Sequence, residues 1–146
     1  MRVVIQRSKE AQVTVEGNVT GKINHGLVVL VGFTEGDSSK EIDYIVNKIV
    51  NLRIFDDENG VMNKSLLDVG GEILSISQFT LYADAKSGRR PSYIKALKSD
   101  QAIVLYEEFN NKIKELNVNV ETGIFGADMK VSLTNDGPVT ILLESD

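Results

Sequence analysis

Few residues in this chain are of the types that common catalytic sites require. The sequence has one histidine, His25 in the turn-like stretch Asn24-His25-Gly26, and no cysteine. A Ser-His-Asp triad would have to use His25, and no G-x-S-x-G sequence places a serine on a sharp turn. Transition-metal sites depend on histidine and cysteine, which leaves carboxylates alone. We therefore interpret His25 as a turn residue facing water, and we expect no metal.

Two short stretches imitate known sites but lack a required part. The acidic sequence DDENG at 56–60 resembles a calcium loop, yet the position five residues after its first aspartate, which must be glycine, is Val61. The sequence SYIK at 92–95 matches S-x-x-K, but the partner motifs of that hydrolase class are absent. We interpret the first as an acidic hairpin turn and the second as a chance match.

The stretch SQFTLYAD at 77–84 combines polar side chains with backbone N–H groups. Ser77, Gln78 and Thr80 supply hydroxyls and an amide directly after a predicted strand at 72–77. By pattern alone, this is a strand that ends in a polar turn, with Phe79 and Leu81 packed inside. Periodicity alone does not mark it as a site.

The stretch NDGPVT at 135–140 raises a question about backbone geometry. Asp-Gly between two alternating apolar runs is a strong hairpin signal. Pro138, however, has no N–H to give to a strand pairing, and its ring fixes φ near −65°. It therefore suits a fixed projection better than a plain hairpin. For the bond before Pro138, sequence alone favours the trans form.

Composition excludes several classes of protein. The chain has 146 residues, 42% of them hydrophobic and 25% charged, which predicts one globular domain spanning 1–146. The net charge of −5 disfavours a general nucleic-acid coat, because such proteins are usually basic. The first residues, MRVVIQRSKE, are too short an apolar run for a signal peptide, and no later run approaches a membrane span. We expect a cytoplasmic protein.

One segment departs from the acidic average. The sequence AKSGRRPSYIKALKS, from Ala85 to Ser99, contains no acid and five basic residues: Lys86, Arg89, Arg90, Lys95 and Lys98. Composition alone favours a solvated loop that enters a helix. The alternative is a local phosphate-contact patch on an acidic protein.

Hydrophobic patterns predict many strands and two main helices. Ser38 and Glu41 have capping-box spacing before a helical stripe from Ile42 to Val50. A second helix is predicted to start near Ser99, with a stripe made of Ala102, Leu105, Tyr106, Phe109, Ile113 and Leu116. Strands are predicted at 3–6, 12–16, 19–23, 27–33 (buried on both faces), 72–77 and 118–122, with strand-like alternation at 129–133 and 139–143. Because regular strand–helix alternation is missing, we predict an α+β fold with a mainly antiparallel sheet or partial barrel.

Several separated stretches together resemble the D-aminoacyl-tRNA deacylases, over residues 1–143. The matching sequences are VIQR at 4–7, NLRIF at 51–55, SLLDVGGEILSISQFTL at 65–81, KSGRRPS at 86–92, ETGIFGADM at 121–129 and NDGPVT at 135–140. The two signature motifs of that family, SQFT and Gly-Pro, are intact at Ser77–Thr80 and Gly137–Pro138. Leu97 and Ser99 depart from the family pattern, which usually has small residues and then a proline after the RRPS sequence. The resemblance implies that this departure alters the shape of one pocket wall and leaves the reaction unchanged.

The resemblance implies hydrolysis of the ester that joins a D-amino acid to tRNA, with glycyl-tRNA as a further substrate. Catalysis is then assigned to Ser77, Gln78, Phe79 and Thr80, with backbone N–H groups near Phe79 and Thr80 stabilising the oxyanion. Thr80 is a candidate nucleophile. Because a threonine needs an adjacent base and no histidine lies beside it in sequence, we favour Thr80 as a positioning group and water as the attacker, with help from a ribose hydroxyl of the tRNA.

The resemblance also assigns the remaining parts of the site. It implies a homodimer with active sites at the subunit interface, in which a cis Gly137–Pro138 bond reaches the partner's site and reads chirality. It assigns no metal or organic cofactor. Further expected roles are the terminal adenosine site or motif bracing for Gln6 and Arg7, the pocket wall for Phe125 and Met129, and tRNA phosphate contact for Lys86, Arg89 and Arg90.

Two other classes of function remain open from the residues alone. The chain could be a non-catalytic, β-rich RNA- or nucleotide-binding module, for which aromatic residues on a basic face are expected. Aromatic residues make up only 6% of the chain and are scattered in sequence. It could also be a structural dimer subunit without activity.

Overall fold

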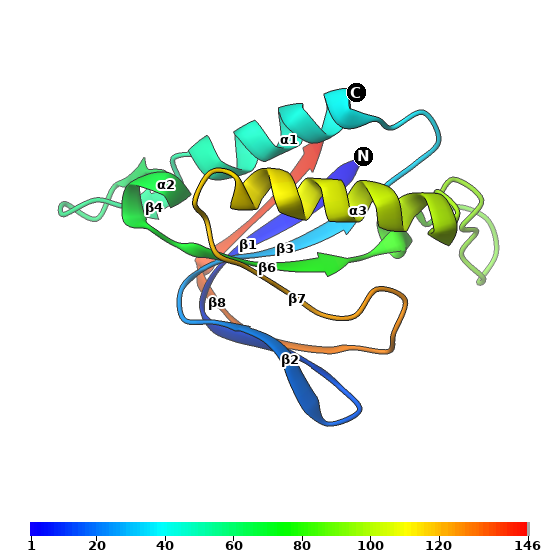
Figure 1. Ribbon diagram of the computed structural model, residues 1–146, viewed down its shortest axis with the longest axis horizontal. Coiled ribbons are helices and arrows are strands. Elements are labelled where there is room, and N and C mark those ends of the chain that lie inside the picture. Colours follow the sequence, from blue (N-terminus) through cyan, green and yellow to red (C-terminus); the bar gives the residue numbers. More distant parts are fainter. Residues whose placement is uncertain (146) are drawn as a thin grey trace.

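The computed structural model describes residues 1–145 and has one main sheet covered by two long helices (Figure 1). The six-stranded sheet has the order β2-β1-β3-β6-β7, and β8 pairs with the other edge of β1. Its strands are β1 (Arg2–Val15), β2 (Asn18–Ile23), β3 (Gly26–Gly32), β6 (Glu72–Ser77), β7 (Val120–Thr122) and β8 (Lys130–Glu144). A small hairpin is formed by β4 (Phe55–Asp56) and β5 (Met62–Lys64). The helices are α1 (Ser39–Asn51), α2 (Leu66–Val69), η1 (Phe79–Tyr82) and α3 (Ser99–Lys114).

The sheet curves into a barrel-like shape, which confirms the predicted α+β class. β1 pairs antiparallel with β2, β3 and β8, whereas β3, β6 and β7 run parallel to one another. The curve brings β2 close to β7 at Gly21. A Cβ atom at this position would lie only 2.6 Å from the backbone oxygen of Thr122, so glycine is the residue that permits this approach.

The two long helices cover one face of the sheet and share a core with it (Figure 1). The predicted capping box of α1 is present, because Ser38 and Glu41 satisfy each other's backbone donors at the helix start. The whole predicted stripe of α1 is buried. In α3, Ala102, Tyr106, Phe109 and Ile113 are buried as predicted.

A second core lies on the other side of the sheet, inside its curve. It contains Ala11, Val13, Ile23, Val28, Leu74 and Ile76, with Met129, Val131 and Leu133 packed against it. Neighbouring residues of β3 alternate between the two cores: Leu27 and Val29 face the helices, and Val28 faces the inside of the curve. The prediction that β3 is buried on both faces is therefore confirmed.

Three predictions differ from the structure. The alternating runs predicted at 129–133 and 139–143 belong to one strand, β8, which begins at Lys130. The predicted strands at 3–6 and 12–16 are one long strand, β1, whose pairing with β8 shifts register around Ser8. The exposed Lys9 and Glu10 interrupt the apolar alternation there, so the pattern suggested a break that the backbone does not make. The predicted helix stripe was wrong at Leu116, which lies beyond the end of α3 and is exposed.

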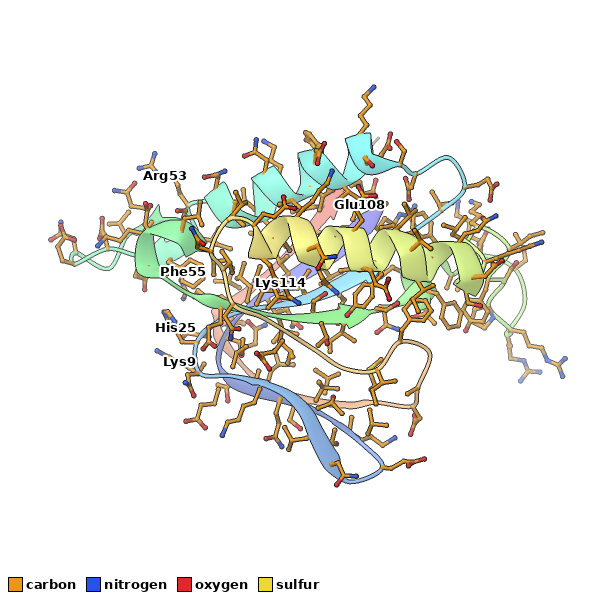
Figure 2. The ribbon with its side chains drawn as sticks, in the orientation of Figure 1. Lys9, His25, Arg53, Phe55, Glu108 and Lys114 are labelled. Atoms are coloured by element: carbon orange, nitrogen blue, oxygen red, sulfur yellow. The ribbon has the colours of Figure 1, made fainter. Side chains whose placement is uncertain are left out.

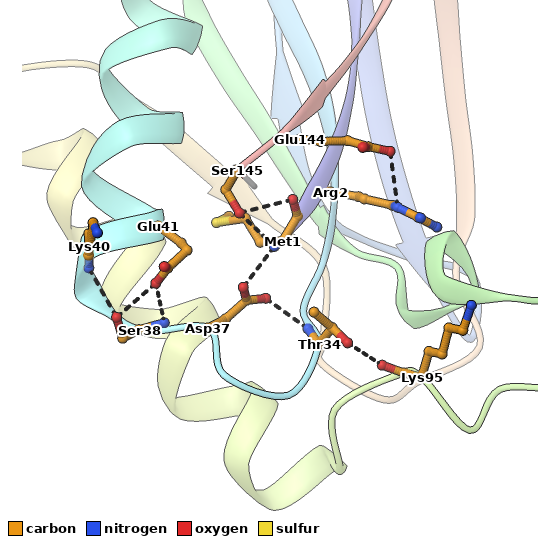
Figure 3. Close-up of polar contacts among 10 residues, drawn as sticks. All are labelled: Met1, Arg2, Thr34, Asp37, Ser38, Lys40, Glu41, Lys95, Glu144 and Ser145. Carbon is orange, nitrogen blue, oxygen red and sulfur yellow. Dashed lines mark hydrogen bonds and ion pairs between the residues drawn. The ribbon is translucent and has the colours of Figure 1, made fainter.

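The ends of β1 and β8 are joined to the loop before α1 (Figure 3). The Met1 ammonium donates to Asp37 Oδ1 and to Ser145 Oγ, at 2.8 Å each. The second carboxylate oxygen of Asp37 accepts from the Thr34 N–H at 2.8 Å. These contacts fix the turn between β3 and α1. Within residues 1–145, no helix is long and apolar enough to cross a membrane.

Candidate active site

The SQFT sequence lies where β6 ends and the backbone changes direction. The Gln78 N–H donates to the Val31 carbonyl at 2.7 Å, which holds the end of β6 against β3. The chain then enters the short helix η1 at Phe79. Because the first donors of a helix have no partner within it, the N–H groups of Phe79 and Thr80 are free, and no acceptor among residues 1–145 takes them.

A cavity of about 530 Å³ opens beside this turn. It brings together Ser77, Gln78 and Phe79 with Phe125 and Met129, all five of them residues that the sequence assigned to the site. The expectation from pattern alone that Phe79 packs inside was wrong, because its side chain is 55% exposed. The remaining lining residues are Val31, Gly32, Phe33, Ile76, Tyr93, Ala96, Leu97, Ser99, Ala102, Gly126, Ala127, Asp128 and Val131.

Thr80 lies next to the cavity without lining it and is exposed. Its Oγ1 accepts a hydrogen bond from Gln78 Nε2 at 2.6 Å. An amide cannot take a proton from a hydroxyl, so this contact orients Thr80 but does not activate it. The single histidine, His25, lies instead beside Phe55, with ring centroids 6.1 Å apart, at the opposite end of the molecule from the 85–99 segment (Figure 2).

The wall of the cavity at Phe125 is supported from behind by Tyr106. The two rings lie 5.8 Å apart, and the Tyr106 hydroxyl donates to the Ser75 carbonyl at 2.8 Å. Burial raises the pKa of the Tyr106 phenol, although hydrogen bonds with the side chains of Ser75 and Asn110 act in the opposite direction. Tyr106 therefore stays neutral at ordinary pH and holds the aromatic wall in place.

The Gly137–Pro138 motif forms a bulge within β8, not a hairpin. Ser8 pairs with Asn135 and Gln6 pairs with Thr140, so five steps along β8 oppose two steps along β1. The extra residues project from the strand pair. Asn135 closes the bulge, because its side chain accepts from the Val139 N–H at 3.1 Å and donates to Thr140 Oγ1 at 2.8 Å.

The bond between Gly137 and Pro138 is cis, as the family resemblance implied. Gly137 also has a φ of +129°, a backbone conformation that residues other than glycine rarely adopt. The motif does not line the cavity of its own chain within the described residues.

Arg7 fixes the bulge from below. Its side chain is only 10% exposed, and its Nε donates to the Asp136 carbonyl at 3.1 Å. Its Nη1 donates to the Ile54 carbonyl at 2.8 Å and lies 3.3 Å from Asp56 Oδ1. The nearby Gln6 Nε2 donates to Thr140 Oγ1 at 3.4 Å. Arg7 and Gln6 thus contact the two ends of the bulge, and neither lines the cavity.

The basic segment occupies the exposed loop between η1 and α3. The side chains of Lys86, Arg89 and Arg90 are exposed, and none forms an ion pair with another described residue. A backbone pairing between Asp84 and Ser92, at 2.8 Å in both directions, closes the base of this loop. Lys86, Arg89 and Arg90 therefore lie within a closed loop and are available to contact an anion.

Sequence reasoning missed several residues that shape these two regions. Tyr93 and Ala102 line the cavity without having been assigned to it, whereas Leu97 and Ser99 line it as their connection with a pocket wall implied. Asp56 and Asp136 pair with Arg7. A signal was available for some of them, because Asp136 lies inside a matching stretch and Asp56 and Tyr93 each directly follow one.

Comparison with known proteins places these features in a family. The family model described as D-Tyr-tRNA(Tyr) deacylase matches residues 4–144. Proteins named D-aminoacyl-tRNA deacylase from Thermosipho africanus and Bacillus velezensis are 60% and 58% identical to this chain, over 99% of its length and 97% and 99% of theirs.

Two solved structures share the fold of this chain. A structure titled "c-Myc DNA Unwinding Element Binding Protein" superposes with a TM-score of 0.94 at 41% identity, covering 100% of this chain and 99% of the other. A structure titled as a probable eukaryotic D-amino acid tRNA deacylase shares the fold, with a TM-score of 0.81 at 19% identity and 97% coverage of both chains. From the family model that matches residues 4–144 and from the relatives at 58–60% identity, the chain belongs to the D-Tyr-tRNA(Tyr) deacylase family.

Proposed function

We propose that this protein hydrolyses the ester bond of D-aminoacyl-tRNA and releases the free D-amino acid and tRNA. The observation that carries the proposal is the pair of free N–H groups at Phe79 and Thr80 beside a cavity of about 530 Å³. Relatives that are 58–60% identical to this chain are named for that activity. Aminoacyl-tRNAs are used in the cytoplasm, so we propose that the enzyme acts there.

The chemistry follows from the neutral groups at the SQFT turn. Ester hydrolysis passes through a tetrahedral intermediate with a negatively charged oxygen, and preorganised N–H donors stabilise that charge. The donors of Phe79 and Thr80 need no rearrangement to do so, because η1 already fixes their direction. Water is the attacking group in this mechanism, and Thr80, oriented by Gln78, positions it or the substrate.

Discrimination between D and L forms needs a second, rigid element. The two forms have equal volume, so a pocket cannot separate them by size, and fixed groups must contact one form and exclude the other. The cis Gly137–Pro138 bulge, held by Arg7, supplies such groups in the backbone. We place the Gly137 carbonyl of one chain at the SQFT turn of a second chain, in a homodimer with two shared sites. Glycine has no side chain to exclude, so glycyl-tRNA is also a substrate.

The basic segment supplies the contact with tRNA. Lys86, Arg89 and Arg90 are exposed and unpaired in the described chain, while the protein as a whole is acidic. A local positive field is sufficient if only the acceptor end of tRNA is held.

The tRNA contact is tested by charge reversal with a matched control. The Arg89→Glu/Arg90→Glu double variant should bind tRNA more weakly and show a smaller salt dependence, because each lost phosphate contact lowers the slope of log affinity against log salt by about 0.7–0.9. Lys22→Glu/Lys40→Glu changes the net charge equally at exposed positions elsewhere and should bind nearly as the unchanged protein does. Equal effects of the two double variants would show that only net charge matters.

The activity is tested by incubating the protein with D-tyrosyl-tRNA and, separately, with L-tyrosyl-tRNA. We expect rapid release of D-tyrosine and no release of L-tyrosine above the rate of spontaneous hydrolysis. Binding of tRNA without release of either amino acid would support the alternative of a non-catalytic RNA-binding module. Equal release of both would leave an esterase without chiral selection.

A further inference from the structure

An exposed apolar surface lies beside the mouth of the cavity and has no role in the mechanism above. It consists of Tyr93 and Ile94, which we call the 93–94 platform. Ile94 is 88% exposed, the largest value among the exposed large apolar side chains of residues 1–145, and Tyr93 is 43% exposed. Single exposed apolar residues are common, but a contiguous exposed group at a site mouth points to a partner.

The backbone that carries the platform is held by hydrogen bonds, so the fold itself keeps the two side chains exposed. The Ala96 N–H donates to the Tyr93 carbonyl at 3.0 Å and closes a turn that carries both side chains. On the far side of this turn, Thr34 Oγ1 donates to the Lys95 carbonyl at 2.6 Å, as Figure 3 shows, and the Leu97 N–H donates to Phe33. The pairing of Asp84 with Ser92 holds the near side. The turn is therefore fixed at both ends.

The platform continues the cavity outward. Tyr93 lines the cavity and packs edge-on against Phe79, with ring centroids 5.2 Å apart and an angle of 71° between the rings. Ile94 does not line the cavity, but it directly follows Tyr93, which does. A ligand whose last unit occupies the cavity would therefore lay its preceding unit on Tyr93 and Ile94.

The charge around the platform identifies the chemistry of that preceding unit. The flanking segment contains five cationic side chains that form no ion pair among the described residues: Lys86, Arg89, Arg90, Lys95 and Lys98. An exposed aromatic and an exposed aliphatic side chain with unpaired cations in the same segment are suited to a nucleotide, whose base stacks while its phosphate contacts the cations. A protein partner would need an acidic surface with a complementary apolar patch.

We propose that the 93–94 platform stacks the base of the nucleotide that precedes the terminal adenosine of tRNA. This proposal rests on the proposed function, since it extends the substrate from the cavity outward along the single-stranded 3′ end. The basic segment contacts the phosphate that joins the two nucleotides. The platform contributes to binding of polynucleotide substrates and makes no contact with the ester.

The test compares two small substrates that differ by one nucleotide: the D-tyrosyl ester of adenosine and the D-tyrosyl ester of cytidylyl-adenosine. For the unchanged protein, kcat/KM should be higher for the dinucleotide. Tyr93→Ala should reduce this ratio about 10-fold, in line with loss of one stacked base. Tyr93→Phe keeps the ring and should preserve the ratio. A ratio that stays unchanged in Tyr93→Ala would overturn the proposal.

A second variant separates base stacking from a subunit contact. Ile94→Asp should also lower the ratio for the dinucleotide, while the molecular mass measured by sedimentation stays as in the unchanged protein. A change of mass would show that the platform is a protein interface and would overturn the proposal. Absence of hydrolysis of both esters by the unchanged protein would instead contradict the proposed function.

Discussion

The SQFT turn and the Gly137–Pro138 bulge differ in exposure and in how firmly neighbouring side chains hold them. At the SQFT turn, Phe79 and Thr80 are exposed, two N–H groups are free and a cavity lies alongside. At the bulge, Arg7 is almost fully buried and contacts Asp136, Asp56 and the Ile54 carbonyl. One region thus offers space and free donors with little side-chain bracing, and the other offers rigid bracing without lining a cavity of its own.

This contrast matches two separate requirements of the proposed reaction. Hydrolysis needs access for an ester and water, and it needs donors that are not already used. Chiral selection needs atoms that do not move when a side chain of the wrong hand presses against them. Because the two requirements fall in different parts of the chain, one region can stay open and the other can be rigid. This arrangement works if the two regions meet across two chains.

The largest effect is expected from the core that supports both regions. Phe109 is fully buried between α3 and the sheet, so Phe109→Ala should lower the free energy of unfolding by about 3–5 kcal/mol through cavity formation. Ile45→Ala in α1 should cost about 2–5 kcal/mol for the same reason. Urea unfolding measures both. A loss of only a few tenths of a kcal/mol would mean that these helix faces do not form the core.

Removal of the bracing should separate the two regions. Arg7→Ala should lower the free energy of unfolding by roughly 2–3 kcal/mol, because it leaves two carbonyls and two carboxylates without their charged donor. Arg7→Lys keeps the charge but cannot reach these groups in several directions at once. Both variants should weaken the discrimination between D- and L-tyrosyl-tRNA. Unchanged discrimination in Arg7→Ala would show that the rigidity of the bulge is not needed.

A change at the SQFT turn should affect hydrolysis and leave the free energy of unfolding nearly unchanged. Thr80 is exposed, so Thr80→Ala should change the free energy of unfolding by no more than about 0.5 kcal/mol. Attack by water predicts that this variant retains measurable release of D-tyrosine. Nucleophilic catalysis by Thr80 predicts near-complete loss, with recovery in Thr80→Ser. Single-turnover hydrolysis of D-tyrosyl-tRNA distinguishes the two.

The smallest effect is expected on stability at low pH, from Glu41 at the start of α1, which lies outside both regions. Hydrogen bonds from the Ser38 hydroxyl and backbone hold the pKa of Glu41 below its ordinary value of 4.5. A lowered pKa in the folded state means that this contribution to stability is present above about pH 4.5 and is lost as the pH falls through the lowered value. Glu41→Gln should therefore lose less stability on acidification than the unchanged protein. Urea midpoints at pH 6 and near pH 3 should show it, with D/L selectivity unchanged.

Local patterns predicted those parts of the fold that depend on nearby residues. The capping box of α1, the strand at 72–77 and the doubly buried β3 follow from spacing alone. The continuous β1 could not be predicted from alternation, because the charged residues Lys9 and Glu10 interrupt its pattern while pairing with neighbouring strands maintains it.

The site was less accessible to sequence reasoning, because its parts meet through the tertiary fold. Phe79 and Tyr93 are far apart in sequence and were interpreted as scattered aromatics, yet their rings are in contact. Asp-Gly at 136–137 is a hairpin signal, and Pro138 favoured a fixed projection instead, but only the pairing of both flanks with β1 shows that this projection is a bulge. Family resemblance, unlike pattern, identified the SQFT and Gly-Pro motifs.

We expect the bulge of one chain to complete the cavity of another, and mixing two defective variants tests this arrangement. Gln78→Glu places a negative charge where the oxyanion must form, and Pro138→Ala displaces the backbone groups that contact the D-aminoacyl group, so each variant alone should hydrolyse D-tyrosyl-tRNA poorly. Refolded together in equal amounts, half of the dimers would contain both chains, with one intact site each. The mixed sample should therefore recover roughly a quarter of the activity of the unchanged protein. A mixed sample that shows only the average of the two separate activities would contradict it.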